Sequence, residues 1–281
     1  MRLGASRFVA GETVSDFIAV TKRANAKGFA VAAGILGEDT RDIEAAHVAT
    51  DAYNELLRRI HDGAFDSTIA LKTTHLGLKV DRELAFENIR SVAATARSLN
   101  NFMRLDMEQS KHVDDTLHIY RQLRGNAFNN VGFVLQAYLY RSLGDLDALL
   151  PLSPNVRIVK GAYLEPASVA FQNKADVDAN YMRLIARSLR DGAYTAIATH
   201  DPAIIEAAIQ LISQENTSRD RFEFQLLYGI SSRLAEQLLD RGYRVRLAIP
   251  FGSYWFPYLM RRLAERPANL GFFLRNAVSR S

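Results

Sequence analysis

The chain has 281 residues, of which 48% are hydrophobic and 23% charged, with a formal net charge of +4. This is the composition of a globular protein with enough length for one large domain. The absence of cysteine excludes a disulfide framework, a catalytic thiol and thiolate metal sites. No apolar run has the length of a membrane span, the first residues do not read as a signal peptide, and the mild charge gives no indication of nucleic-acid binding.

Eight short apolar runs alternate with longer segments of helical period. The predicted strands are residues 28–36, 67–72, 101–106, 131–138, 155–163, 194–200, 222–229 and 243–252. The predicted helices are residues 38–61, 81–99, 112–123, 142–150, 176–191, 201–213, 231–242 and 254–266, followed by a short terminal helix over 269–278. Asp81, Asp201 and either Ser231 or Ser232 are expected to cap the helices that they precede.

The apolar runs are continuous rather than alternating, which is typical of strands buried on both faces. Eight strand–helix units therefore predict an α/β protein with a single (β/α)8 TIM-type barrel over residues 1–281. An open doubly wound sheet is the alternative. It is disfavoured because no G-x-G-x-x-G and no Walker-type loop follows any strand.

In a barrel of this type the site lies at the C-terminal ends of the strands. Polar side chains recur there on six successive strands. A purely structural barrel wall would not gather them at one end, so they indicate a polar site. They are Lys72, Asp106, Gln136, Arg157, Lys160, Tyr163, Thr199, His200 and Gln225. With the exposed backbone of Gly161, they predict a mouth that binds a large anionic cofactor and a small charged substrate. No zinc motif, nucleophile elbow or glycosidase carboxylate pair is present, so no metal is expected.

The last predicted helix carries four polar side chains at helical spacing. Tyr258, Arg261, Arg262 and Glu265 fall on one stripe. The stripe is either a solvated face with an Arg–Glu pair or a paired guanidinium clamp for a carboxylate or phosphate. The position of the helix decides between these interpretations.

Several longer motifs carry a family resemblance. The segments RIVKGAYLEP, IATHD, FEFQLLYG and IPFGSYWFPYLMRRLAERPANLGFFLR resemble the monofunctional, flavin-dependent proline dehydrogenases, and the matches run in order from Arg7 to Arg275. The resemblance implies a barrel with a final lid helix that carries the arginine pair. It also implies oxidation of L-proline to Δ1-pyrroline-5-carboxylate by FAD, with electrons passed to a quinone, as the first step of proline catabolism.

The resemblance also implies roles for individual residues. Lys72, Asp106 and Arg157 match the catalytic positions, and Arg157 would stabilise reduced, anionic flavin. Arg261 and Arg262 would bind the substrate carboxylate, and Glu265 would hold one of them in place. The substrate pocket would also include Lys72, Asp106, Tyr163, Leu227, Ala248 and Tyr258. The flavin-contacting positions would be Gln136, Arg157, Val159, Gly161, Ala162, Thr199 and His200.

Two positions depart from the family pattern. Relatives usually have tyrosine two residues before the proline of the eighth strand, where this chain has Ala248. The first strand has Ala32 and Gly34 in place of a threonine and an aspartate. Leu247 or Tyr254 could refill the space beside Ala248. The alternatives to a proline enzyme are a divergent member acting on hydroxyproline or another imino acid, and a flavin-binding relative with little turnover.

The partners expected from the resemblance are proline or a related imino acid, a membrane quinone and a pyrroline-5-carboxylate dehydrogenase; nucleic acid is not expected. The expected location is the cytoplasm, with peripheral association at the inner face of the membrane as an open alternative.

Overall fold

A computed structural model describes residues 7–265, and in it eight parallel strands close into a barrel. The strands are β1 (Ala30–Ile35), β2 (Ser67–Lys72), β3 (Met103–Asp106), β4 (Val131–Gln136), β5 (Asn155–Val159), β6 (Tyr194–Ala198), β7 (Phe222–Leu227) and β8 (Val245–Phe251). Each strand pairs in parallel with the next, and β8 pairs with β1. The predicted (β/α)8 TIM-type barrel is confirmed.

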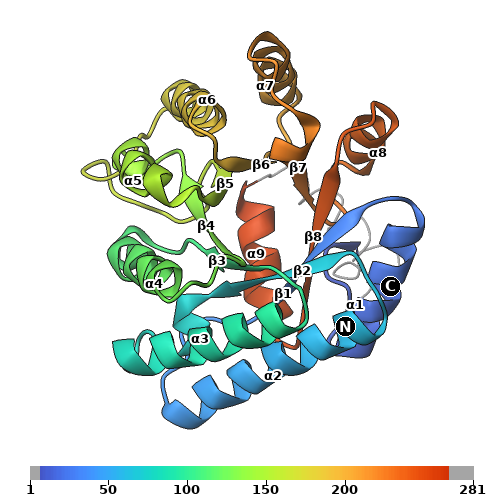
Figure 1. The fold of residues 1–281 in the computed structure, drawn as a ribbon, viewed down its shortest axis with the longest axis vertical. Coiled ribbons are helices and arrows are strands. Elements are labelled where there is room, and N and C mark those ends of the chain that lie inside the picture. The colour runs from blue at the N-terminus through green and yellow to red at the C-terminus, as the bar shows by residue number, and fades with distance from the viewer. Residues whose placement is uncertain (1–6, 266–281) are drawn as a thin grey trace, which may run out of the picture.

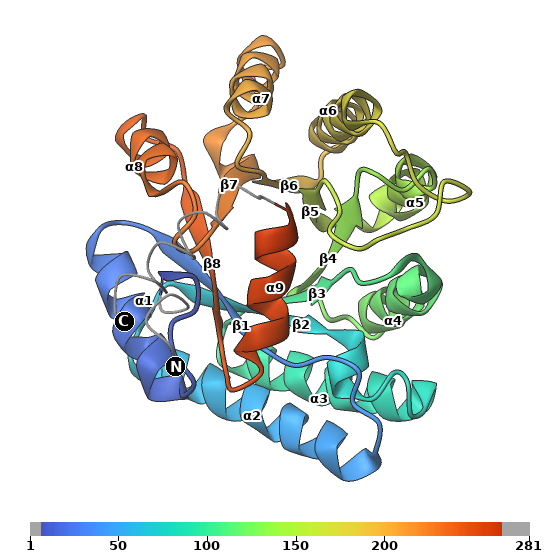
Figure 2. The same cartoon turned by 180° about the vertical axis from the view of Figure 1, so that it is seen from behind.

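Helices surround the ring of strands, and a final helix lies across it (Figures 1 and 2). They are α1 (Val14–Ala26), α2 (Ile43–Asp62), α3 (Arg82–Ser98), α4 (Val113–Gly125), α5 (Ser142–Leu149), α6 (Lys174–Arg190), α7 (Pro202–Gln214), α8 (Ser232–Asp240) and α9 (Trp255–Glu265). None of the helices among residues 7–265 is long and apolar enough to traverse a lipid bilayer. The short helix predicted over 269–278 lies outside the described residues.

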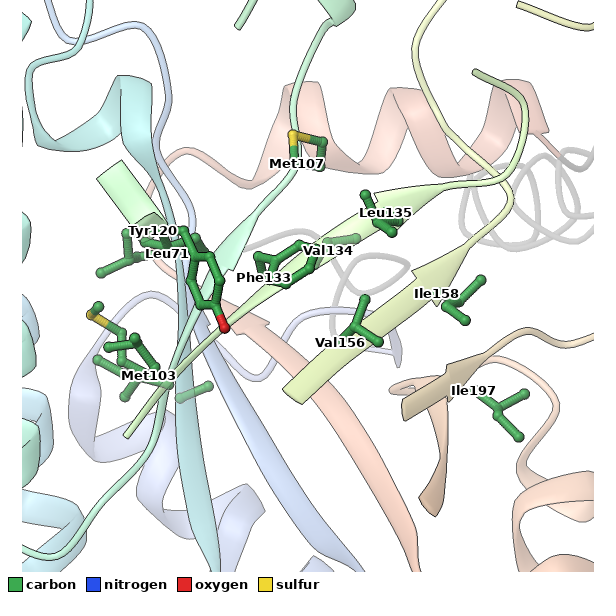
Figure 3. Close-up of a cluster of buried hydrophobic side chains, with 14 of the residues drawn as sticks. Leu71, Met103, Met107, Tyr120, Phe133, Val134, Leu135, Val156, Ile158 and Ile197 are labelled. Carbon is green, nitrogen blue, oxygen red and sulfur yellow. The ribbon is translucent and has the colours of Figure 1, made fainter. Parts of the chain in front are cut away.

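The main hydrophobic core lies between the strands and the surrounding helices. Alternate strand residues face outward into it, and the facing helix stripes cover them. On β4, for example, Phe133 packs against Tyr120 of α4 with ring centroids 4.6 Å apart (Figure 3). Both side chains are fully buried. Burial of one large apolar side chain stabilises the folded state by about 1.5–3 kcal/mol. The other face of each strand is thereby directed into the barrel.

Helix α1 is absent from the sequence prediction. Its N-terminus forms a capping box, in which the Thr13 hydroxyl accepts from the Asp16 N–H and the Asp16 carboxylate accepts from the Thr13 N–H. Phe17 then stacks on Phe251 of β8, with ring centroids 4.9 Å apart. The helix thus closes the outer layer beside β1 and β8.

Two predicted helix starts need correction. Helix α2 begins at Ile43 rather than residue 38, because Asp42 caps it by accepting from the N–H of Ala45. Ser231 occupies the N-cap position of α8 with a left-handed backbone (φ 54°), and its side chain makes no capping hydrogen bond. The predicted caps Asp81 and Asp201 are confirmed.

Candidate active site at the mouth of the barrel

Small side chains line the part of the barrel nearest the C-terminal ends of the strands. The inward positions on β1, β2, β6 and β8 are Ala32, Gly34, Ala70, Ala196, Ala198 and Ala248. A methyl group built on Gly34 would meet no described atom within 4 Å. Among the described residues, the barrel therefore has open space beside Gly34 on the β1 side.

A charged cluster lies opposite these small residues. Arg157 of β5 donates from one Nη to the Asp106 carboxylate of β3 and from the other to Gln225 Oε1 of β7, at 3.3 Å. These strands are not neighbours in the sheet, so the three side chains meet inside the barrel. Burial, followed by the charge of the nearby Arg104 guanidinium, lowers the pKa of Arg157 to about 9. Arg157 therefore stays cationic at neutral pH.

Lys72 stands beside Asp106, at partnered positions on β2 and β3. Its ammonium forms an ion pair with Glu38, which lies in the loop after β1. Sequence reasoning missed Glu38, although an acidic residue directly after the first strand was a usable signal. Burial, followed by the Lys72 charge, lowers the pKa of the neighbouring His75 to about 4. His75 is therefore neutral beside this ion pair.

Gln136 ends β4 with its amide orientation fixed. Its Nε2 donates to the carbonyls of Met107 and Glu108, at 3.3 and 3.1 Å. The amide oxygen Oε1 is buried and has no hydrogen-bond partner among the described residues. The Glu108 carboxylate in turn accepts from the backbone and hydroxyl of Thr74, at 3.0 and 2.6 Å. The loops after β2 and β3 thus hold Gln136 with an acceptor left unused.

The loop after β5 comes close to the end of β4. Val159 pairs with Gln136, and Gly161 lies so near Tyr138 that a Cβ would meet its ring at 2.3 Å. Gly161 also has φ +122°, which favours glycine. Ala162 is exposed and Tyr163 is half-buried in the same loop. At Gly161 the backbone of this loop therefore packs directly against Tyr138, with no side chain between them.

Thr199 and His200 follow β6. The Thr199 hydroxyl accepts from the N–H of Asp201, at 3.2 Å. His200 Nε2 accepts from the N–H of Leu227 at the end of β7, at 2.9 Å. His200 thereby joins the loop after β6 to the end of β7, and it does so with an unprotonated Nε2.

Lys160 is held by carboxylates of the two helices that follow β5 and β6. Its Nζ lies 2.6 Å from Asp178 Oδ1 of α6 and 3.0 Å from Asp201 Oδ2 at the start of α7. The strand ends at Val159, so the inward–outward alternation no longer applies one residue later. Lys160 therefore links the loop after β5 to α6 and to the start of α7.

Ala248 lies within the small-residue wall, as the substrate-pocket prediction requires. It is partnered with Ala32 on one side and with Leu227 on the other. Leu247 does not fill the adjacent space, because it packs outward into the core, and Tyr254 is about half exposed.

Helix α9 follows β8 directly, at the end of the barrel where these groups gather. Leu259 packs with Phe8 and Val9 of the N-terminal segment, and Tyr258 is half-buried against this group. The backbone of α9 includes Arg261, Arg262 and Glu265, but their side chains lie outside the described part of the structure. The paired guanidinium clamp stays a prediction.

Comparison with known proteins places the chain in a family. A family model described as "Proline dehydrogenase" matches residues 17–275. Proline dehydrogenase 1 of Bacillus subtilis subsp. natto is 40% identical over 279 residues, covering 99% of this chain and 92% of the relative. The proline dehydrogenase of Deinococcus radiodurans is 41% identical over 278 residues, covering 98% and 90%.

Solved structures show the same barrel. The crystal structure of proline utilization A from Bdellovibrio bacteriovorus, inactivated by N-propargylglycine, matches with a TM-score of 0.87 and 25% identity. The match covers 92% of this chain but only 32% of that much longer chain. A mutant of the Bradyrhizobium japonicum protein of the same name matches with a TM-score of 0.79 and 21% identity, which shows the fold alone.

Proposed function

Because the chain belongs to the proline dehydrogenase family, we propose that it oxidises L-proline to Δ1-pyrroline-5-carboxylate. A hydride leaves the ring carbon next to nitrogen and a proton leaves the nitrogen, so that a C=N bond forms. When bound, FAD supplies the hydride acceptor, and a membrane quinone takes the two electrons. The observation that carries the proposal is the Asp106–Arg157–Gln225 cluster inside the barrel.

Two buried polar atoms on adjacent strands support a flavin in this mouth. Arg157 Nε is a donor and Gln136 Oε1 an acceptor, and neither has a partner among residues 7–265. A flavin ring offers both acceptor atoms and an N–H donor along its polar edge. Gly161 adds no side chain to the loop after β5, where its backbone packs against Tyr138. Val159, Ala162, Thr199 and His200 complete the proposed cofactor contacts.

The balance of charge supports the clamp for the substrate carboxylate. Lys72 is paired with Glu38, and Arg157 with Asp106, so these two cations are already neutralised. A substrate carboxylate therefore needs further positive charge. Arg261 and Arg262 supply it in the proposal, and Glu265 holds one of them in place. Such charge-assisted, bidentate contacts would orient the reacting carbon toward the flavin.

A divergent substrate is the second candidate, and the wall formed by Ala32 and Ala248 favours it. Hydroxyproline or another imino acid would fit where a bulkier side chain would obstruct it. Tyr163, Leu227 and Tyr258 would form the rest of the pocket. A flavin-binding relative with little turnover is the remaining alternative.

In the proposal, the enzyme works on the cytoplasmic side of the membrane and delivers electrons to a quinone there. Its product would pass to a separate pyrroline-5-carboxylate dehydrogenase.

Purified protein tests the proposal in one assay. We expect flavin absorption bands, proline-dependent reduction of a soluble quinone, and Δ1-pyrroline-5-carboxylate as the product identified by mass. Reduction with hydroxyproline but not proline would favour the divergent substrate. Bound flavin with no turnover of any imino acid would favour the inactive relative.

A further inference from the structure

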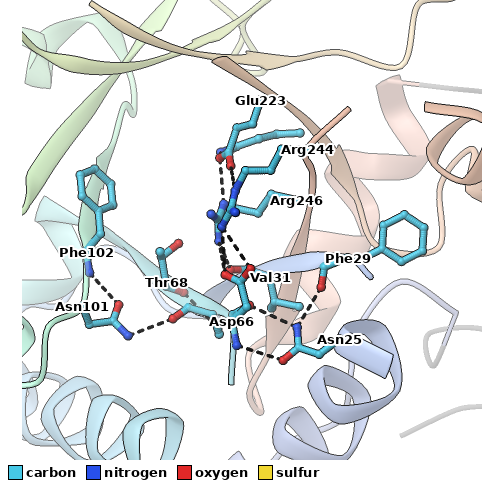
Figure 4. Close-up of polar contacts among 12 residues, drawn as sticks. Asn25, Phe29, Val31, Asp66, Thr68, Asn101, Phe102, Glu223, Arg244 and Arg246 are labelled. Carbon is cyan, nitrogen blue, oxygen red and sulfur yellow. Dashed lines mark hydrogen bonds and ion pairs between the residues drawn. The ribbon is translucent and has the colours of Figure 1, made fainter. Parts of the chain in front are cut away.

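Glu223 is a fully buried carboxylate that the proposed reaction does not use. It lies on β7, two residues before Gln225, with only 2% of its surface exposed. Its Oε1 accepts from Arg246 Nε at 2.8 Å, and its Oε2 accepts from Arg244 Nε at 3.2 Å. Arg244 also binds Asp66, so the group extends to the N-terminal end of the barrel (Figure 4).

Glu223 also binds the amide of Gln225. Gln225 Nε2 donates to Glu223 Oε1 at 2.6 Å. Glu223 stays ionised: burial raises the pKa of its carboxyl, but the charge and hydrogen bond of Arg246, then the Gln225 hydrogen bond and the Arg104 charge, outweigh this and lower the pKa overall. An ionised carboxylate can only accept hydrogen bonds, so it must face the NH2 group of the amide. The amide oxygen is thereby left to face the other way.

That oxygen accepts from Arg157. Gln225 Oε1 lies 3.3 Å from Arg157 Nη1, while the other Nη of Arg157 binds Asp106. The guanidinium is thus held from two opposite strands, β7 and β3. A reversed amide would direct NH2 donors at a guanidinium that can only donate, which would release one of the two contacts.

We propose that Glu223 is a positioning residue that fixes the Gln225 amide and, through it, the guanidinium of Arg157 at the flavin site. The inference rests on the proposed function for its consequence at the flavin, and on the hydrogen bonds above for the positioning itself.

The direction in which the flavin reduction potential shifts separates positioning through Arg157 from a direct electrostatic effect of the Glu223 charge. Glu223→Gln removes a buried negative charge, which by itself would favour reduced flavin. If Glu223 instead acts through Arg157, the variant displaces a cation and favours oxidised flavin. We expect the affinity for reduced relative to oxidised flavin to fall about tenfold, which is about 30 mV for a two-electron couple. Glu206 is an exposed residue that forms an ion pair with Arg241. Its variant Glu206→Gln is the control and should leave the flavin reduction potential unchanged.

Gln225→Met supplies a neutral second variant, which also serves if Glu223→Gln does not fold. It should lower the potential to a similar extent. The double variant should show no further fall, because Glu223 acts through Gln225. A raised or unchanged potential in Glu223→Gln, or full additivity of the two changes, would overturn the proposal.

The flavin-free protein tests the positioning independently of the proposed function. The NMR signal of the Arg157 Nε–H group is identified by its loss in Arg157→Met. It should shift in Glu223→Gln and Gln225→Met but not in Glu206→Gln. An unshifted signal in both buried-site variants contradicts the inference. Failure of the wild-type protein to bind flavin would instead overturn the proposed function, and the Arg157 signal would still decide the positioning.

Discussion

Arg157 reaches across the barrel to Asp106, so a cation from β5 and a carboxylate from β3 are joined although β4 separates them in the sheet. The contact fixes the guanidinium while Arg157 Nε keeps a hydrogen available to a ligand. Lys72 stands next to the same carboxylate on β2. The catalytic groups implied by the family resemblance therefore converge in space.

Arg157→Met should lower the reduction potential of the bound flavin. The variant removes a nearly buried positive charge that would stabilise the negative charge of reduced flavin. The shift should be on the order of 30 mV, a tenfold change for a two-electron couple. Potentiometric titration measures it, with Arg90→Met on the exposed face of α3 as the control. An unchanged potential in a flavin-loaded variant would rule out this role.

Arg261→Lys and Arg262→Lys should each reduce kcat/KM for proline by far more than Arg59→Lys, a change at an exposed position of α2. Lysine cannot reproduce a bidentate contact to a carboxylate. The loss should be about 2–4 kcal/mol in kcat/KM. Steady-state kinetics of the three variants provide the comparison. Near-normal efficiency in both α9 variants would refute the clamp.

Ala248→Tyr should improve proline turnover and sharpen the preference for proline over 4-hydroxyproline. The tyrosine ring would fill the space beside Ala32 and obstruct a ring hydroxyl. Pocket changes of this kind shift discrimination by about 1–3 kcal/mol, roughly 10–200-fold. The measurement is kcat/KM for both substrates, with the outward-facing Leu247→Met as control. If the tyrosine variant gains neither efficiency nor preference, Ala248 does not set specificity.

His75 should make the stability of the fold sensitive to acid. Its pKa is lowered to about 4 by burial first and by Lys72 second, so the folded state disfavours the protonated form. The resulting stability is present above the unfolded pKa of about 6.5 and is lost as the pH falls toward 4. Between these values the wild type should lose up to about 3 kcal/mol of unfolding free energy more than His75→Gln does.

Denaturant titrations at several pH values measure this difference, with the exposed His61→Gln as control. Parallel pH profiles for the wild type and His75→Gln would show that His75 is not the group responsible.

The barrel could be predicted because its signal is repeated and local. Strands buried on both faces leave continuous apolar runs, and β2 has the predicted bounds of residues 67–72. Helix α1 was missed even though its capping box is visible as Thr13 and Asp16, three residues apart. Its apolar stripe lies ahead of the first strand, outside the repeating strand–helix unit.

The site could be predicted only in part, because strand alternation stops where loops begin. Asp106 and Gln136 lie within strands and were placed at the correct end. Lys160 lies one residue past β5 and turns to the helices. The ion pair of Glu38 with Lys72 and the Glu223–Gln225 contact depend on tertiary placement, which sequence spacing does not supply.

Anaerobic addition of proline to the purified, flavin-loaded protein tests the central claim most directly. Hydride transfer from proline should bleach the visible flavin band without any added electron acceptor, and readmission of a soluble quinone should restore the band. A flavin band that neither proline nor hydroxyproline bleaches, in protein whose flavin dithionite still reduces, would contradict the claim that this chain is an imino-acid dehydrogenase.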